Sequence, residues 1–352
     1  MSAMRRSLTP VVYCTVLAAL LALVCPAALV SALGTESAAV APWQKEDFAV
    51  FGYLPEYRLG GFDYEAAFQA GLTHLLFFSL EIDKKGLPTA LDRLPSKEAA
   101  KAARTAADKV GGKVLISFGG NARSDNFGEM ATNIKRRKAF LVALEKLMRD
   151  YEFDGIDYNW EYPRHHGEWR AWGTLMEETK LLLEGRAIVT FTMYLDPNHY
   201  DVITRYGLLS KAHYVHCMAY DQPRQHSTFA FFKSGIRLGR EKKFNLPQLT
   251  MGLPFYSRDV HNGHPKTYAE LQEHLDNEVD DQHGPDYFNS RATIAKKVKA
   301  AKEAGLGGVM IWELGQDVQP LDDSRSLMTA LRDALPWKVP GAGAAGSAAD
   351  EL

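Results

Sequence analysis

The sequence is poor in cysteine and has no large excess of charge of either sign. Three of its 352 residues are cysteine, and 41 lysine and arginine residues nearly balance 43 aspartate and glutamate residues, for a formal net charge of −2. Such a chain has no broad positive field to hold a polyphosphate, which argues against nucleic acid as a partner. Hydrophobic residues make up 46% of the chain, too many for disorder along its whole length.

Long hydrophobic runs are also nearly absent. The one candidate, "VVYCTVLAALLALV" at residues 11–24, is shorter than the roughly 20 residues that span a bilayer. It follows Arg5 and Arg6 and precedes a small-residue cleavage site at Val30-Ser31-Ala32. We therefore predict a secretory signal peptide at residues 1–32, with an uncleaved membrane anchor as the alternative.

Cleavage after this segment would remove two of the three cysteines, Cys14 and Cys25, and leave Cys217 alone. The mature protein would enter an oxidising compartment without an intrachain disulfide, and without a membrane-associated segment.

The other end of the chain, residues 338–352, is rich in alanine and glycine and ends in "ADEL". We interpret it as a flexible tail whose ending resembles an endoplasmic-reticulum retrieval signal, with Ala349 where lysine is usual. The expected location is the secretory pathway, either secreted or retained in the reticulum lumen. A terminus that carries no address is the alternative.

Between the two ends, short apolar runs alternate with helical patterns over about 290 residues. Several runs are almost continuously apolar, as strands buried on both faces must be. This alternation predicts a single (β/α)8 TIM barrel over residues 44–337, without a sizeable insertion domain. A doubly wound sheet is the alternative, but no G-x-G-x-x-G follows the first run. The eight runs are at residues 48–54, 72–82, 113–121, 153–162, 187–195, 213–221, 249–257 and 307–315.

Two of the helical patterns are clear enough to assign a buried face. One places Phe140, Leu141, Leu144, Leu147, Met148 and Tyr151 on a single side. The other, at residues 293–304, turns three apolar residues inward, namely Ile294, Val298 and Ala301. We expect the lysines Lys296, Lys299 and Lys302 to form its solvated face.

The fourth run contains an unusual ladder of polar residues within "DGIDYNWEYP", residues 154–163. Alternate side chains of a strand face the same way, so Asp157, Asn159 and Glu161 should point into the barrel. Their neighbours Ile156, Tyr158 and Trp160 should pack against the helices. An amphipathic strand with a wet face would show the same alternation, but carboxylates buried in a central strand are costly unless paired or functional.

The segment "FDGIDYNWEYP" resembles the D-G-x-D-x-D-x-E signature of family 18 glycoside hydrolases, the chitinases and their relatives. The resemblance extends from about Phe48 to Pro336 and includes several motifs in order. These are "ISFGG" at 116–120, "MAYD" at 218–221, "GLPFYSR" at 252–258 and "GGVMIWELGQD" at 307–317.

The resemblance implies hydrolysis of β-1,4-linked N-acetylglucosamine by substrate-assisted catalysis, in which the sugar's own acetamide replaces an enzyme nucleophile. Glu161 matches the family's acid/base, and a raised pKa would suit that role. Asp157 matches the inner aspartate, and Tyr53 and Ser117 match the residues that support it. Tyr220 matches the tyrosine that donates to the acetamide. The implied substrate-binding residues are Tyr53, Ser117, Asp154, Met218, Asp221, Arg258 and Trp312, the last as an indole floor beneath the sugar.

Asn159 departs from the family pattern, which has aspartate at this position. Its carbonyl can still accept a hydrogen bond from the acetamide N–H. An amide cannot supply the negative charge that balances an oxazolinium ion, nor can it raise the glutamate's pKa by repulsion. We expect a slow enzyme that lacks about 2.7–4 kcal/mol of transition-state stabilisation.

The stretch from Asp259 to Phe288, about 30 residues, is too short for the small α+β insertion of many family members, and favours an open groove and endo cleavage. No metal is expected, because His213 and His216 should lie on opposite faces of a strand, and no cofactor is implied. The expected partner is a polysaccharide or oligosaccharide that contains N-acetylglucosamine. Two alternatives remain open: a chitin-binding lectin with little turnover, and a lumenal endo-β-N-acetylglucosaminidase acting on N-glycan cores.

Overall fold

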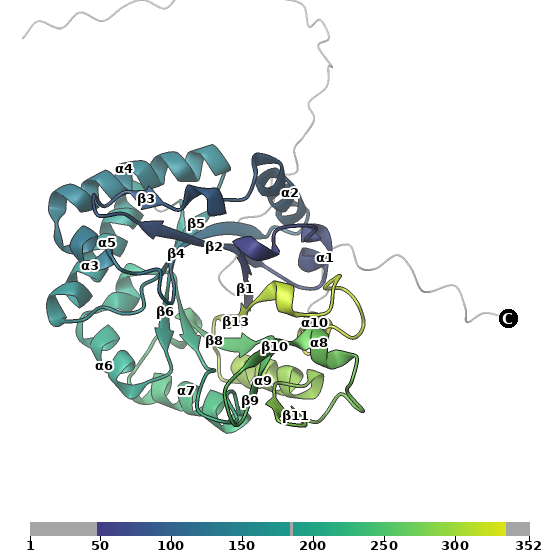
Figure 1. Cartoon of the computed structure of the whole chain (residues 1–352). Coiled ribbons are helices and arrows are strands. Elements are labelled where there is room, and N and C mark those ends of the chain that lie inside the picture. Colours follow the sequence, from purple (N-terminus) through teal and green to yellow (C-terminus); the bar gives the residue numbers. More distant parts are fainter. Residues whose placement is uncertain (1–47, 184–185, 336–352) are drawn as a thin grey trace, which may run out of the picture. The chain divides into compact units, whose positions relative to one another are not determined.

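Eight parallel strands form a closed barrel in the computed structural model, which describes residues 48–183 and 186–335 (Figure 1). The strands pair in the order β1-β13-β8-β7-β6-β5-β4-β2, and the pairing of β1 with β2 closes the ring. Their bounds are β1 Ala49–Pro55, β2 His74–Ile82, β4 Lys113–Gly119, β5 Gly155–Asn159, β6 Ile188–Tyr194, β7 Tyr214–Met218, β8 Leu249–Pro254 and β13 Gly308–Trp312. The predicted (β/α)8 barrel and all eight predicted strands are confirmed.

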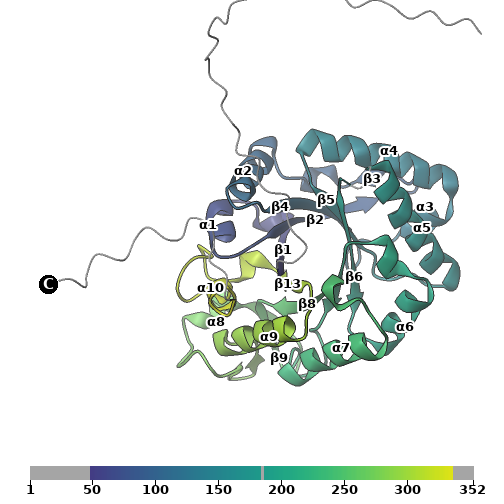
Figure 2. The same ribbon diagram turned by 180° about the vertical axis from the view of Figure 1, so that it is seen from behind.

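Helices cover the outside of the barrel, as the view from behind also shows (Figure 2). The strands are buried on both faces, so their near-continuous hydrophobic runs serve both the barrel interior and the contacts with the helices. The helices are α1 Tyr64–Gln69, α2 Lys97–Asp108, α3 Phe127–Thr132, α4 Ile134–Tyr151, α5 His166–Leu182, α6 Pro197–Arg205, α7 Phe229–Glu241, α8 Tyr268–Gln272, α9 Arg291–Glu303 and α10 Leu327–Asp333.

The two predicted helix faces are also confirmed, except that Tyr151, the last residue of the first face, is only partly buried. α4 begins at a side-chain cap, because Asn133 accepts the N–H groups of Lys135 and Arg136, and it buries Phe140, Leu141, Leu144, Leu147 and Met148. In α9 the three predicted apolar residues are buried, and Lys296, Lys299 and Lys302 are exposed. The pattern missed Lys297, which is fully buried on the same helix.

A small antiparallel sheet lies between β8 and α9 and takes the place of a larger insertion. Its order is β10-β9-β12-β11, and it lies beside α8 in the lower part of Figure 1. These strands are two to four residues long, so the described segment between β8 and α9 contains no sizeable insertion domain, as predicted. Their bounds are β9 Tyr256–Asp259, β10 Pro265–Thr267, β11 Gln282–His283 and β12 Asp286–Tyr287, and one further short strand, β3 Pro88–Thr89, pairs with β2.

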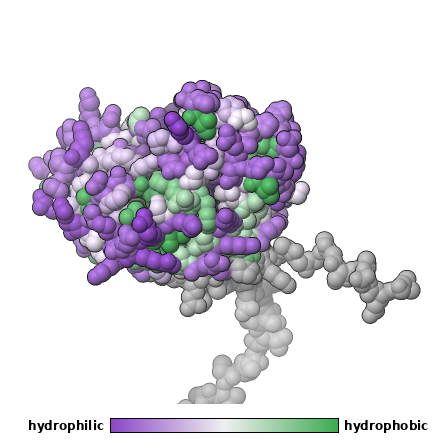
Figure 3. Space-filling model, turned by 90° about the horizontal axis from the view of Figure 1, so that it is seen from below, coloured by the Kyte–Doolittle hydropathy of each residue, from purple (hydrophilic) through white to green (hydrophobic). Residues whose placement is uncertain are grey.

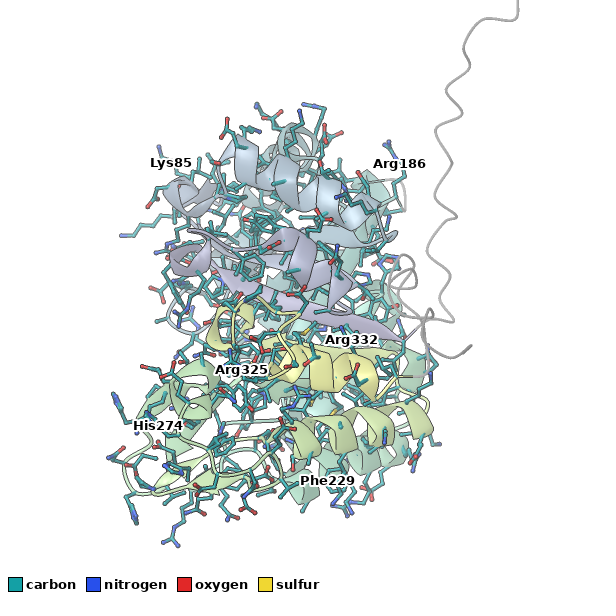
Figure 4. All side chains as sticks on the ribbon, turned by 90° about the vertical axis from the view of Figure 1, so that its right-hand side faces the viewer. Lys85, Arg186, Phe229, His274, Arg325 and Arg332 are labelled. Carbon is teal, nitrogen blue, oxygen red and sulfur yellow. The ribbon has the colours of Figure 1, made fainter. Side chains whose placement is uncertain are left out.

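The two ends of the barrel can be identified from side chains in Figure 4. Lys85, in the turn that follows β2, and Arg186, just before β6, lie on opposite sides of that view. The side of Lys85 is therefore the carboxyl end of the strands, where barrel enzymes place their chemistry.

Most of the surface seen in Figure 3 is hydrophilic, with smaller hydrophobic areas between the polar residues. Within residues 48–183 and 186–335, no helix has the length and hydrophobicity to cross a membrane. The predicted signal peptide at 1–32 and the tail at 338–352 lie outside the described residues.

Candidate active site

The polar ladder of β5 lies inside the barrel, as its alternation predicted. Asp157 and Asn159 are buried, and Ile156, Tyr158 and Trp160 belong to the core between strands and helices. The Tyr158 hydroxyl is hydrogen-bonded to Thr179 of α5 at 2.6 Å. This outward packing fixes the rotation of the strand and so directs the polar residues towards the barrel axis.

β5 is shorter than the predicted run, because the backbone leaves the ladder after Asn159. The Asn159 carbonyl accepts the N–H of Gly120 at 2.6 Å instead of a strand partner. The Ser124 hydroxyl then accepts the N–H of Glu161 at 3.1 Å. Glu161 therefore lies just beyond the strand, in the loop at the carboxyl end of the barrel.

The glycine pair of "ISFGG" makes this arrangement sterically possible. Gly119 and Gly120 have φ angles of 97° and 106°, which favour glycine. A Cβ on Gly119 would lie 2.3 Å from the carbonyl oxygen of Asn159. This motif of β4 thus allows its backbone to approach the end of β5.

Asp157 is fully buried and is surrounded by hydroxyl donors. Its Oδ2 accepts from Tyr53 at 2.9 Å and from Ser117 at 2.8 Å, and its Oδ1 accepts from Thr190 at 2.8 Å. Burial raises the pKa of Asp157 to about 6, although these three hydroxyls oppose the shift. Three hydroxyl donors stabilise the ionised carboxylate, so Asp157 carries a negative charge inside the barrel at neutral pH.

The oxygen and the nitrogen of the Asn159 side chain both have hydrogen-bond partners. Its Oδ1 accepts a hydrogen bond from Thr192, and its amide is hydrogen-bonded to the Glu161 carboxylate. Burial raises the pKa of Glu161 to about 7, while the bonds from Asn159 and Tyr162 oppose the shift and the charges of Asp221 and Asp157 add to it. Glu161 is therefore a carboxylic acid that can hold its proton near neutral pH.

Tyr220 and Asp221 lie in the loop after β7, because this strand ends at Met218, three residues before the end of the predicted run at 213–221. Asp221 has a left-handed φ of 65° and accepts from Tyr256 at 2.7 Å and from Arg258 Nε at 2.6 Å. Burial opposes ionisation of Asp221, yet the nearby His226, with Nδ1 at 3.7 Å, and the donors Arg258 and Tyr256 together lower its pKa well below the ordinary range. Asp221 is therefore a second fixed negative charge.

Trp312, at the end of β13, forms an aromatic floor with two other side chains. Its ring centroid lies 4.7 Å from that of Phe78 and 5.5 Å from that of Tyr53. Trp312, Tyr53, Phe78, Met218 and Tyr220 belong to one cluster inside the barrel. The rings of Phe78 and Tyr53 are inclined to the indole by 84° and 54°, so the flat apolar face is that of Trp312 itself, and such a face suits the C–H side of a sugar ring.

The structure brings ten of the eleven predicted site residues to this end of the barrel, but not Asp154. Asp154 precedes β5, and its Oδ2 accepts the N–H of Val114 at the start of β4 and pairs with Arg104 of α2. It lies at the opposite end of the strand, so the expectation of substrate binding is corrected here.

We predict that Asp154→Ala lowers stability without affecting the site. The change removes a charged acceptor from Arg104 and from a backbone N–H, so we expect the free energy of unfolding to fall by about 1–3 kcal/mol. Urea unfolding measures this loss. Any affinity for oligosaccharides that the unmodified protein shows should stay within twofold in this variant, and a larger loss would restore Asp154 to the site.

Several residues of the site were not identified from the sequence. The hydroxyls of Ser124, Thr190 and Thr192 hold the ladder, Phe78 extends the floor, and Tyr256 and His226 contact Asp221. His216, also inside the barrel, has its Nε2 3.9 Å from Asp157 Oδ1. Among the residues that the structure describes, no three His, Cys, Asp or Glu side chains are grouped to bind a metal.

Comparison with known proteins identifies the family. The family described as "Glycosyl hydrolases family 18" matches residues 49–317, and the chain belongs to it. Chitinase 1 of Aphanocladium album is 24% identical over 259 residues, which cover 57% of this chain. The chain spans only 61% of the length of that relative.

Solved structures show the same fold. The chitinase ChiB of Flavobacterium johnsoniae has a TM-score of 0.70 at 23% identity, covering 82% of this chain and 94% of its own. YKL-39, solved in the presence of chitooligosaccharides, has a TM-score of 0.69 at 16% identity, covering 83% of this chain and all of its own.

Proposed function

We propose that this protein is a chitinase-like glycosidase that cleaves β-1,4 linkages between N-acetylglucosamine residues. The observation that carries the proposal is Glu161, a mostly buried carboxyl at the barrel mouth whose pKa is raised to about 7. The charges of two other carboxyls, Asp157 and Asp221, act on it, and it interacts with Tyr53 of the aromatic cluster. Membership of family 18 supports this assignment.

Glu161 would act twice in the reaction. The acetamido oxygen of the bound sugar attacks its own anomeric carbon as the glycosidic bond breaks, and Glu161 gives its proton to the departing oxygen. The carboxylate then takes a proton from a water molecule, whose oxygen opens the oxazolinium ion at the same carbon. Glu161 ends protonated, ready for another cycle.

The surrounding residues would orient the sugar and balance its charge. Trp312 supports the ring, and Tyr220 donates to the acetamide. The Asp157 carboxylate, which is fully buried, supplies negative charge. Asn159 contributes only dipoles, and its carbonyl, already bonded to Thr192, would accept the acetamide N–H with its second lone pair.

The pH dependence of hydrolysis tests the assignment of Glu161. The glutamate must be protonated to act as the acid, so kcat/KM should fall as pH rises through about 7. A fluorogenic chitotriose substrate, followed from pH 4 to 9, measures this limb. Activity that stays constant up to pH 9 would contradict a carboxylic acid in this role.

A second candidate function is binding of N-acetylglucosamine polymers with little turnover. Asn159 favours it, because its amide stabilises ionised Glu161 and lacks the charge needed by an oxazolinium ion. Calorimetric binding of chitotetraose, together with no released product in long incubations, would support this function over hydrolysis.

The "ADEL" ending motivates a third possibility, a lumenal enzyme acting on the chitobiose core of N-glycans. Incubation with a high-mannose glycopeptide, beside a chitin hexamer of equal concentration, separates the two substrate classes. Release of glycan from the peptide without cleavage of the hexamer would support the lumenal substrate. Fractionation of secretory compartments would test the proposed location.

A further inference from the structure

The loop between β7 and α7 carries two residues of the site and is closed at its base by Ser227. The hydroxyl of Ser227 donates to the carbonyl of Ala219 at 3.1 Å, directly before Tyr220 and Asp221. The N–H of Gln222 donates to the carbonyl of His226 at 3.1 Å. The loop, residues 219–227, therefore forms a ring that ends where α7 begins at Phe229, a residue labelled in Figure 4.

The side chain of Lys297, in α9, contacts the base of this loop at Ser227. Its side chain is fully buried, and Nζ lies 2.8 Å from the Ser227 carbonyl, 2.8 Å from Ser227 Oγ and 2.6 Å from Asn289 Oδ1. An ammonium group has three protons, and each has one acceptor here. Burial lowers the pKa of Lys297 to about 7, although the charge of Asp281 opposes the shift.

Lys297 lowers the stability of the folded state in exchange for its contacts with this loop. No ion pair within residues 48–183 and 186–335 includes Lys297. Its ammonium is hydrogen-bonded to neutral oxygens and lies 5.4 Å from the centroid of the Phe232 ring, and the charge of Asp281 acts on it without a direct contact. A buried ammonium without a carboxylate partner costs free energy of folding that an apolar residue would not.

The ammonium determines where the single proton of Ser227 goes. Asn289 Oδ1 lies 3.3 Å from Ser227 Oγ and would otherwise compete with Ala219 for the hydroxyl proton. Lys297 donates to both Oγ and Asn289 Oδ1, which leaves the hydroxyl proton for the Ala219 carbonyl. The Asn289 amide completes the network by donating to the Ser227 carbonyl at 2.9 Å.

We propose that Lys297 is a positioning residue of the active site. It acts through Ser227 to hold residues 219–227 in the conformation that presents Tyr220 and Asp221 to the substrate. The effect of Lys297 on catalysis rests on the proposed hydrolysis, whereas its effect on the conformation of residues 219–227 does not.

The hold on the loop can be tested without any substrate. We would measure backbone hydrogen exchange of the full protein at pH 6, where the ammonium is present, in Lys297→Met and in the milder Ser227→Ala. Lys299→Met, on an exposed position of the same helix, is the matched control. Exchange in residues 219–228 should become at least tenfold faster in both variants and stay unchanged in the control, with β5 still protected.

Activity and its pH dependence test the consequence for the site. The charge of Asp221 helps to raise the pKa of Glu161. A displaced Asp221 should therefore move the alkaline limb of kcat/KM to lower pH, with at least a tenfold loss at pH 6. Loss of folded protein alone would not move that limb. Lys297→Met should add little to the loss caused by Asp221→Asn.

Two results would overturn the proposal: exchange in residues 219–228 as slow as in the unmodified protein in both variants, or exchange that accelerates evenly throughout the barrel. If the unmodified protein hydrolyses nothing, the proposed activity fails, and the exchange experiment still decides the role of Lys297.

Discussion

Glu161→Gln abolishes most hydrolysis, with an expected fall in kcat of about 10²–10⁴-fold, the usual contribution of general acid–base catalysis. Glutamine has nearly the same shape and can keep a hydrogen bond to Asn159. It has no proton to give at a pH near 7, and it cannot accept one from water. The chitotriose assay at pH 6 measures the loss, and calorimetry with chitotetraose should show binding within a few fold of the unmodified protein.

The free energy of unfolding, measured as a function of pH, shows whether Glu161 destabilises the folded protein. Its pKa rises from an ordinary 4.5 to about 7 on folding, so the folded state binds the proton more tightly than the unfolded state. Stability should therefore decline as pH rises from 4.5 to 7. Glu161→Gln removes this penalty, and we expect a gain of up to about 3 kcal/mol at pH 8 and none at pH 4.

Glu145→Gln, on an exposed position of α4, is the control for both measurements, because it removes a carboxylate far from the barrel mouth. It should leave kcat unchanged and should not reproduce the gain in stability at pH 8. A Glu161→Gln variant that keeps more than a tenth of the original kcat would show that another group supplies the proton.

The position of the site could be predicted because a strand has an exact two-residue period. Asp157, Asn159 and Glu161 share parity, and the structure places the first two inside the barrel with Glu161 just beyond them. The same rule could have excluded Asp154, which is an odd number of residues from Asp157. Two inward hydroxyls of β6, Thr190 and Thr192, repeat the period on the neighbouring strand and could have been found in the same way.

Other features depend on contacts between distant segments and leave little trace in the sequence. The end of β5 is set by a hydroxyl from the loop after β4, and the pKa of Asp221 by donors from β9 and from the loop before α7. Lys297 is intermediate between these cases. It lies three residues after Ile294 and four before Ala301, on the buried stripe of α9, but its partners are only visible in the fold.

Asn159→Asp should raise kcat by roughly 10²–10³-fold, the reverse of losing one electrostatic contribution to the transition state. A carboxylate at this position keeps the bond from Thr192 and adds a negative charge beside the oxazolinium ion. It also replaces an amide that lowers the pKa of Glu161 with a charge that raises it. The alkaline limb of kcat/KM should therefore move to higher pH in the same variant.

The added charge should also change the thermal stability of the variant. This change distinguishes an electrostatic effect on activity from a general improvement in folding. Asn159 is 3% exposed, and a carboxylate there would lie close to two others, Asp157 and Glu161. We expect lower thermal stability above pH 7, where repulsion cannot be relieved by a shared proton, together with higher activity below it.

Asn198→Asp makes the same amide-to-acid change at an exposed position in the first turn of α6 and should leave both properties unchanged. Chitotetraose binding that persists in Asn159→Asp without any gain in turnover would contradict the hydrolase and favour a binding protein. A gain in turnover that Glu161→Gln removes from the double variant would instead show that the barrel already holds a competent acid, and that the amide alone limits its rate.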